Sequence, residues 1–247
     1  NTLTEAGTVT EAAVESGAEL MGYSGWSGSN NLSVDSSDFD IGTGNFSMMI
    51  WFKTSSSTSY ETWMHYGDAS SILQQYAIRM TDNSTVHALV NDTVTEVDAG
   101  TTDVFDDDVW HMAACTYNGA DGSLDLYVDG VFKDNTTNTN MGSLTDASAI
   151  MKIGANPMDS HPADDSTLAL ARFSTTELTA TQIRQIYDAE KGMFVASAEC
   201  LLQSGSTDAV LDVDVDPLTG KVLVTQTDAI TIFDGLAVDS KPTVNAG

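Results

Sequence analysis

The residues best suited to chemistry lie in one loop, which reads Asn-Pro-Met-Asp-Ser-His-Pro-Ala-Asp-Asp at positions 156–165. It offers three carboxylates, one amide and one imidazole, from Asp159, Asp164, Asp165, Asn156 and His161. Calcium prefers several hard oxygen ligands that converge from loops, and prolines restrict the backbone here. The three aspartates are therefore candidate calcium ligands, and Asn156 and His161 are candidate contacts to a bound glycan. A solvated polar loop is the alternative interpretation.

A second acidic group, at positions 106–108, precedes Trp110 in an expected turn. Asp106 and Asp108 are the candidate calcium ligands here, set against the interpretation of a solvated acidic turn. The alternating acids of residues 212–216 resemble a calcium loop only superficially. Strand alternation spaces such carboxylates along one face, so a solvated face is expected for them.

Sugar binding commonly pairs an exposed aromatic ring with hydrogen-bonding side chains, because a pyranose ring has an apolar face. Trp63 and Tyr66, in Glu-Thr-Trp-Met-His-Tyr, and Trp26, among serines and glycines, are the candidate glycan-binding aromatics. Each could instead belong to the core, which is the expected place of Trp51 and Trp110.

The charge of the chain restricts its partners. Nine Lys and Arg residues against 36 Asp and Glu residues give a formal net charge of −27 and a pI near 4.1. Such a surface repels phosphate and anionic lipid, so neither nucleic acid nor membrane is an expected partner. No apolar run approaches the length needed for membrane insertion. The acidity suits either a protein that works in salty water, where charges are screened, or one that collects divalent cations.

The two cysteines, Cys115 and Cys200, cannot form a disulfide framework. Cys115 falls at an inward position of an expected strand, so a buried free thiol is the first interpretation. The sequence leaves open whether Cys115 and Cys200 are bridged.

The elements that would position these residues are mostly strands. Residues 111–117 and 123–129 alternate with period 2. Asn118-Gly119 and Asp121-Gly122 lie in the turn between them, and Asp129-Gly130 follows the second, which predicts a β-meander. Many short strands with turns rich in Gly, Asp, Asn and Ser between residues 21 and about 151 predict a β-sandwich. Residues 1–20 are expected to be an extended arm, with a weaker helical alternative at residues 11–20.

The pattern changes twice near the C-terminus. Thr179 and Gln182 form a capping-box sequence before Ile183, Ile186 and Tyr187, which predicts one short helix that Gly192 ends. Residues 195–247 then contain three expected strands, at 209–215, 221–226 and 229–233. The sequence therefore predicts a sandwich over residues 21–194 and a small three-stranded β-module after it.

Three segments resemble the laminin-G-like, concanavalin A-like lectin/glucanase superfamily. The first is Asn-Leu-Ser-Val-Asp at 31–35 followed by Ile-Gly-Thr-Gly-Asn-Phe-Ser-Met-Met-Ile-Trp-Phe-Lys at 41–53. The second is Trp-His-Met-Ala-Ala…Tyr-Val-Asp-Gly at 110–130. The third is Ile-Gly-Ala-Asn at 153–156 and Leu-Ala-Leu-Ala-Arg-Phe at 168–173, followed by Leu-Thr-x-x-Gln-Ile. The resemblance implies a concanavalin-like jelly-roll sandwich, with calcium as a cofactor known in such domains. The arm around residues 14–25 and the tail at residues 200–203 also resemble proteins encoded by tailed phages, particularly marine ones.

Enzyme chemistry is not expected from this sequence. Glucanases of the superfamily carry Glu-x-Asp-x-Glu on one strand, and none of the nine glutamates is spaced that way. Nucleophile-elbow, phosphate-loop and His-Glu-x-x-His motifs are missing, and the four histidines show no ligand spacing.

The leading hypothesis is a non-enzymatic protein on the virion surface, a fibre, spike or capsid decoration that recognises host glycan. Its partners would be other virion subunits or further copies of itself, as a homo-oligomer. A secreted or cell-surface, calcium-dependent lectin-like adhesin is the first alternative. A polysaccharide hydrolase or lyase is the second.

Overall fold

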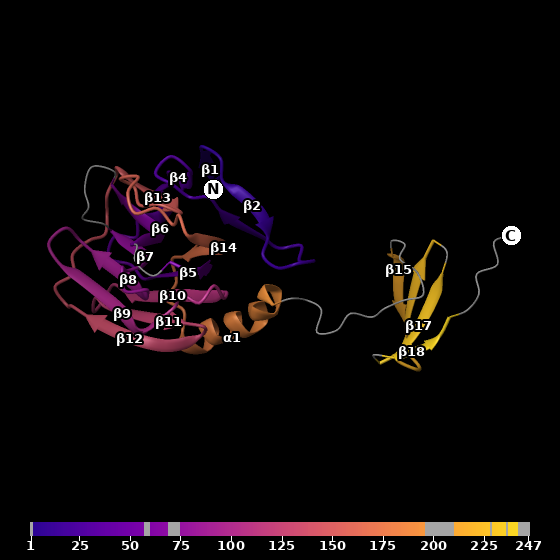
Figure 1. The fold of residues 1–247 in the computed structure, drawn as a ribbon. Coiled ribbons are helices and arrows are strands. Elements are labelled where there is room, and N and C mark those ends of the chain that lie inside the picture. The colour runs from indigo at the N-terminus through magenta and orange to yellow at the C-terminus, as the bar shows by residue number, and fades with distance from the viewer. Residues whose placement is uncertain are drawn as a thin grey trace. The chain divides into compact units, whose positions relative to one another are not determined.

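The chain folds into two units, residues 1–197 and 198–247. The computed structural model describes residues 2–56, 60–68, 75–195, 210–227, 229–235 and 237–241. The first unit holds two seven-stranded antiparallel sheets, and the second holds a four-stranded antiparallel sheet (Figure 1). Within the described residues, no helix is both long and apolar enough to cross a bilayer.

The first sheet, called sheet A, has the strand order β1-β4-β13-β6-β7-β8-β9. Its strands are β1 (Thr4–Ala6), β4 (Asn31–Val34), β6 (Glu61–Asp68), β7 (Tyr76–Met80), β8 (Thr85–Asn91), β9 (Glu96–Val104) and β13 (Ala149–Ile153). The middle strands are buried along most of their length, on both faces. The burial of successive residues suits a sheet that is covered on both sides.

The second sheet, called sheet B, has the strand order β12-β11-β10-β5-β14-β3-β2. Its strands are β2 (Thr10–Ala13), β3 (Met21–Ser24), β5 (Phe46–Thr54), β10 (His111–Asn118), β11 (Ser123–Val128), β12 (Val131–Thr137) and β14 (Ser166–Ser174). The predicted hairpin is confirmed as β10 and β11, in which Asn118 pairs with Ser123. Asp129 and Gly130 have φ values of 55° and 68° and reverse the chain into β12, as Asp-Gly turns with positive φ do.

The main core lies between the two sheets, so the predicted jelly-roll sandwich is confirmed. Side chains from both sheets interdigitate there, and Phe52 of sheet B stacks on Trp63 of sheet A with 3.9 Å between ring centroids. Burial of one such side chain contributes about 1.5–3 kcal/mol. Gly154, at φ 85°, passes so close to the Trp26 ring that an added Cβ would lie 2.0 Å from it.

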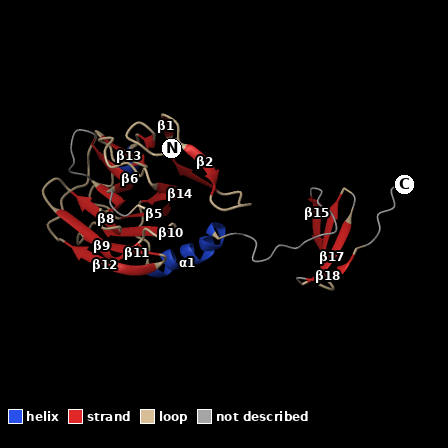
Figure 2. Ribbon diagram, in the orientation of Figure 1, coloured by secondary structure: helices blue, strands red, loops and turns tan. Residues whose placement is uncertain are grey.

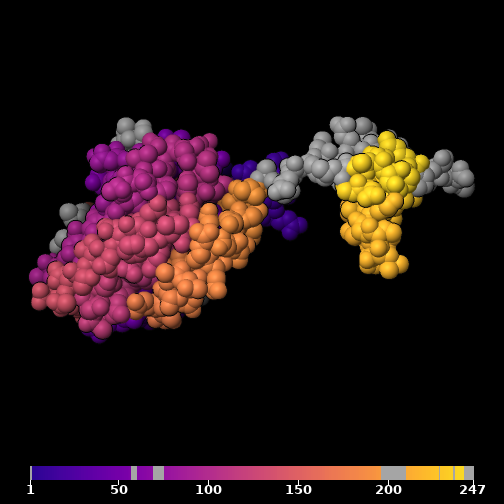
Figure 3. Space-filling model, turned by 90° about the horizontal axis from the view of Figure 1, so that it is seen from below, coloured from indigo at the N-terminus to yellow at the C-terminus, as the bar shows by residue number. Residues whose placement is uncertain are grey.

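The predicted helix is α1 (Ala180–Glu190), and both hydrogen bonds of its capping box are present at Thr179 and Gln182. The last residue of the helix is Glu190, and Lys191 is its C-cap, so Gly192 is not the cap. The chain continues from Lys191 to Phe194 as a 3₁₀ turn. Ile183 is fully buried against the outer face of sheet B, where Phe194 stacks on Trp51 at 4.0 Å. In Figure 3 the orange surface of α1 lies along the pink surface that includes β12.

Both ends of the chain differ in detail from the expectation. The expected N-terminal arm supplies β1, which pairs with β4, and β2, which pairs with β3, so it extends one edge of each sheet. Residues 10–13 are a strand rather than the start of a helix. The second unit has four strands, β15 (Val210–Val215), β16 (Val222–Gln226), β17 (Ile230–Asp234) and β18 (Ala237–Ser240), seen in red in Figure 2. The fourth, β18, follows the Asp234-Gly235 turn.

Candidate functional site

The loop at residues 154–165 crosses from β13 of sheet A to β14 of sheet B and is fastened to β6 on the way. The His161 carbonyl accepts a hydrogen bond from the Thr62 amide at 3.0 Å, and the Gly154 amide donates to the Trp63 carbonyl at 3.0 Å. Asn156 holds the loop from within, because its side chain donates to Ser160 Oγ and accepts from the Ser160 amide, both at 2.9 Å. Asn156 is 3% exposed and therefore shapes the loop rather than facing a ligand.

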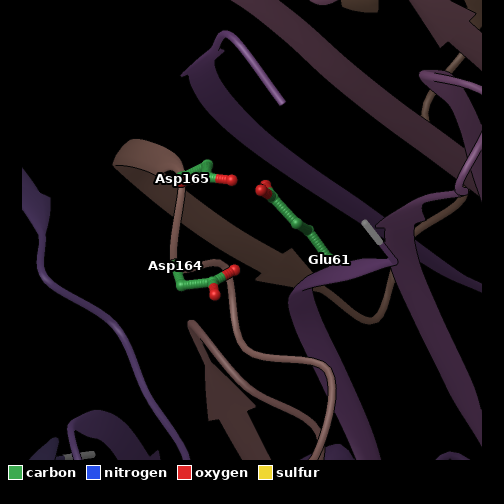
Figure 4. Close-up of side chains that lie close together, drawn as sticks. All are labelled: Glu61, Asp164 and Asp165. Carbon is green, nitrogen blue, oxygen red and sulfur yellow. The ribbon is translucent and has the colours of Figure 1, made fainter. Parts of the chain in front are cut away.

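The three predicted aspartates of this loop do not form one site. Asp159, at φ 58°, makes a salt bridge with Lys152 and accepts a hydrogen bond from Asn31 at 3.4 Å. Its charge is neutralised there, which corrects its prediction as a calcium ligand. Asp164 and Asp165 instead lie beside Glu61, at the start of β6 (Figure 4).

The carboxylate cluster of Glu61, Asp164 and Asp165 brings one oxygen atom of each residue within 4.8 Å of the others. Figure 4 shows the three side chains converging from β6 and from the end of the loop before β14. Both aspartates are exposed, whereas Glu61 has no solvent exposure. The sequence offered no signal for Glu61, because its partners are about a hundred residues away along the chain.

Only one of the two carboxylate oxygens of Glu61 has hydrogen-bond partners among the described residues. Its Oε2 accepts a hydrogen bond from Ser166 Oγ and another from Trp63 Nε1 at 3.4 Å. Its Oε1 is buried and has no hydrogen-bond partner among the described residues. Burial raises the pKa of the Glu61 carboxyl, the bonds from Ser166 and Trp63 oppose this, and the charges of Asp165 and Asp164 raise it further.

The donor set fits a hard divalent cation. Calcium takes six to eight oxygen ligands from carboxylates, carbonyls and water, and a buried carboxylate oxygen without a partner is costly unless something binds it. Glu61, Asp164 and Asp165 would hold the ion. Because Glu61 belongs to sheet A and the aspartates adjoin β14 of sheet B, the ion would fasten the loop to both sheets.

The carboxylates of the acidic turn before β10 do not converge in the described structure, contrary to the prediction for Asp106 and Asp108. Its side chains separate, since Asp106 accepts from Ser84 Oγ at 3.1 Å and Asp108 lies 3.8 Å from Lys53 Nζ. Asp107 contacts His111 Nε2 at 3.1 Å. Within the described part of the chain, the carboxylate cluster is the one group that brings three such ligands together.

The three predicted glycan-binding aromatics are core residues, and that prediction is wrong. Trp26, Trp63 and Tyr66 are 2%, 0% and 1% exposed. A register shift between Thr62 and Met64 resets the alternation of β6, so Trp63 and Met64 both face the main core.

An exposed aromatic residue lies directly before β6 instead. Tyr60 is 42% exposed, its ring meets the His161 ring at 5.8 Å and 70°, and Arg79 Cζ lies 5.9 Å from its centroid. His161 thus stays at the surface, as predicted for a ligand contact, while Tyr60 and Arg79 were missed.

Comparison with known proteins identifies similar folds. A family model described as the concanavalin A-like lectin/glucanases superfamily matches residues 27–184. No curated protein matches the sequence.

Three solved structures illustrate the likeness. The binding domain of Paraclostridial Mosquitocidal Protein 1 has a TM-score of 0.62 at 10% identity, covering 93% of this chain and 59% of that one. The botulinum neurotoxin serotype D ligand-binding domain, in complex with N-acetylneuraminic acid, has a TM-score of 0.59 at 12% identity, covering 94% and 56%. Domain 4 of AbnA, a GH43 extracellular arabinanase from Geobacillus stearothermophilus, in complex with arabinotriose, has a TM-score of 0.57 at 18% identity, covering 75% and 87%. This chain spans less than two thirds of the two toxin domains, and the likeness establishes the fold.

Proposed function

The chain belongs to the concanavalin A-like lectin/glucanase superfamily, and from that premise we propose that it is a non-enzymatic recognition protein that binds host-cell glycans from the surface of a tailed-phage virion. The observation that carries this proposal is the carboxylate cluster, which suits a cation that fixes a surface loop rather than a substrate that must be cleaved. The neurotoxin and arabinanase domains of similar fold are complexed with sugars, which supports the same class of ligand.

The geometry of Glu61 argues for binding rather than hydrolysis. Retaining glycosidases need two carboxyl groups about 5–5.5 Å apart that both reach the scissile bond. Glu61 lies near two aspartates at a comparable distance, but it has no solvent exposure. Ser166 and Trp63 occupy its Oε2, so a sugar oxygen has no access to the carboxyl group in this structure.

The virion context rests on different features. The acidic chain suits a particle in salty water, and the arm and tail resemble those of proteins encoded by tailed phages. In the second unit, Leu211, Val213 and Val215 of β15 are 67%, 55% and 52% exposed. Exposed apolar side chains on an edge strand favour docking to another subunit.

A calcium-dependent adhesin that works outside any virion is the second candidate, favoured by the same carboxylate cluster. The two candidates share glycan recognition and differ in their assembly. Subunit stoichiometry, measured by light scattering on the wild type and on an L211S/V213S variant, separates them. A virion component should form an oligomer that this variant disrupts, whereas a free adhesin should show the same mass for both.

Binding of the labelled full-length protein to a panel of marine bacteria, with calcium and with chelator, tests the proposal. Binding to a subset of strains supports glycan recognition, and its loss in chelator assigns the cation a part in it. Release of reducing ends or unsaturated sugars from host polysaccharide would contradict the proposal, as would failure to bind any strain in either condition.

A further inference from the structure

We propose that the outer surface beside Tyr60 binds a pyranose saccharide, with the Tyr60 ring stacked on the sugar and the Arg79–Asp98 pair hydrogen-bonded to its hydroxyl groups. This inference rests on the proposed function, because it names the surface and the ligand class of the same recognition protein. It concerns a place on sheet A that is formed by residues distinct from the carboxylate cluster.

Three separate segments build this surface. Tyr60 precedes β6, Arg79 belongs to β7, and His161 belongs to the loop between β13 and β14. Arg79 and His161 each lie within about 6 Å of the Tyr60 ring centroid. The hydrogen bond from the Thr62 amide to the His161 carbonyl fixes the loop beside the ring. A partly exposed ring held by its neighbours loses little conformational freedom when a flat ligand stacks on it.

Polar groups of both kinds continue from Arg79 across the face of sheet A. Arg79 Nη2 donates to Asp98 Oδ2 at 2.9 Å, and His87 Nδ1 lies 2.7 Å from Asp98 Oδ1. The side chains of these three residues are 24–28% exposed, so a ligand reaches them. Burial raises the pKa of Asp98, but His87 and Arg79 outweigh it and lower the pKa overall, which keeps the carboxylate charged. The surface therefore presents donors and acceptors beside an aromatic ring.

Buried polar atoms lie inside sheet A beside Arg79. Arg79 Nε, Gln75 Oε1 and both ring nitrogens of His65 have no hydrogen-bond partner among the described residues. His65 of β6 pairs with Ala77 of β7, and Ala77 lies between Gln75 and Arg79 in the sequence. Burial, with the nearby charges of Arg79 and Lys152, lowers the pKa of His65 to about 3, so its ring is neutral and offers one donor and one acceptor.

This mixed set discriminates between ligand classes. An anion offers acceptors only and a metal ion binds acceptors only, whereas hydroxyl groups donate and accept. At the partly exposed Arg79–Asp98 pair, a saccharide hydroxyl can donate to the carboxylate and accept from the guanidinium. A guanidinium carries five N–H donors, of which the bond to Asp98 uses one.

The test compares matched variants of the full chain on an array of neutral and acidic pyranose oligosaccharides and on the bacterial panel. Y60A removes the ring and R79M removes the donors while keeping the aliphatic stem. Y60F keeps the ring, and F132A removes a 51% exposed ring from β12 of sheet B. We expect Y60A and R79M to bind saccharide and bacteria at least tenfold more weakly than the wild type. Y60F and F132A should bind like the wild type. The Tm of Y60A should equal that of the wild type.

Three outcomes would overturn the inference. Wild-type affinity in both Y60A and R79M overturns it and leaves the proposed function standing. Wild-type binding to bacteria without binding to any saccharide overturns the inference and also contradicts the glycan recognition of the proposed function. Failure of the wild type to bind any strain overturns the proposed function, and the inference falls with it.

Discussion

Glu61 combines complete burial, an unpartnered oxygen and two acidic neighbours, and no other described side chain has that combination. Taken alone, it destabilises the fold, because a buried carboxyl with a raised pKa prefers to be neutral. A divalent cation would reverse this preference. The residue would therefore couple ion binding to the stability of the loop at residues 154–165.

Calcium should raise the Tm of the wild type, and chelator should lower it, because an ion bound only to the folded state stabilises that state. The gain should be smaller at about pH 5 than at about pH 7, since protons compete for Glu61. D164N and D165N should abolish the calcium effect, measured by scanning calorimetry. D106N, which removes a carboxylate outside the cluster, is the matched control, and equal calcium effects in all variants would refute the site.

His111 should make stability fall as the pH rises. Burial lowers its pKa, but hydrogen bonds and charges from Asp129, at 2.7 Å, and Asp107 outweigh this and raise the pKa overall. Protonation of His111 therefore stabilises the folded state fully below its ordinary value of 6.5, and this contribution disappears as the pH rises through the folded pKa.

The measurement is urea unfolding of the wild type and H111Q from about pH 6 to pH 9. The difference in unfolding free energy between the two should shrink toward high pH. Parallel curves over the whole range would show that the imidazolium contributes nothing.

Several elements of the first unit follow what local residue chemistry predicts. Alternation in β10 and β11, turn residues such as Asp129-Gly130 and the Thr179 capping box each specify their own geometry. Helix α1 also contributes to packing, because its Ile183 and Phe194 of the 3₁₀ turn after it cover an apolar layer on the outer face of sheet B.

T179A should destabilise the first unit by about 1 kcal/mol, because it removes the side-chain acceptor of the Gln182 amide. T181A, an exposed substitution two residues later in α1, should leave stability equal or slightly higher, because alanine favours helix. Chemical unfolding followed by tryptophan fluorescence measures both. A loss as large in T181A as in T179A would contradict the role of the cap.

At the scale of the whole molecule, charge is the dominant feature. A net charge of −27 on 247 residues makes the folded state repel itself, and the described salt bridges engage only part of the acidic side chains. The second unit presents exposed apolar residues on β15 in addition to this charge.

Sodium chloride should therefore stabilise the protein. Raising sodium chloride from about 0.05 M to about 0.5 M shortens the Debye length well below 10 Å. We expect the Tm of the protein in chelator to rise by several degrees, which corresponds to a gain of about 1–2 kcal/mol in the free energy of unfolding. Sucrose at matched osmolality is the control for effects other than screening. A Tm that does not change with salt would show that repulsion is not a significant cost.

How much could be predicted differs between fold and site. The strand pattern, the hairpin and the helix follow from period-2 alternation, turn residues and a capping box, which act over a few residues. The candidate site was predicted in part. The loop was identified, and Asp164 and Asp165 lie in the cluster, but Asp159 is paired with Lys152 and the predicted aromatics are buried.

The amino-acid sequence by itself determined the sandwich, its family resemblance and the acidic surface, because each depends on local periodicity or on composition. Only the tertiary structure decided which groups meet. Glu61 reaches Asp164 through the stacking of two sheets, and a one-residue register shift in β6 precedes the inward-facing Met64. Alternation along a strand tells which residues share a face, but not which face is buried or which distant loop lies over it. Pairing between distant strands sets those choices, and it also left Tyr60, rather than Trp63, at the surface.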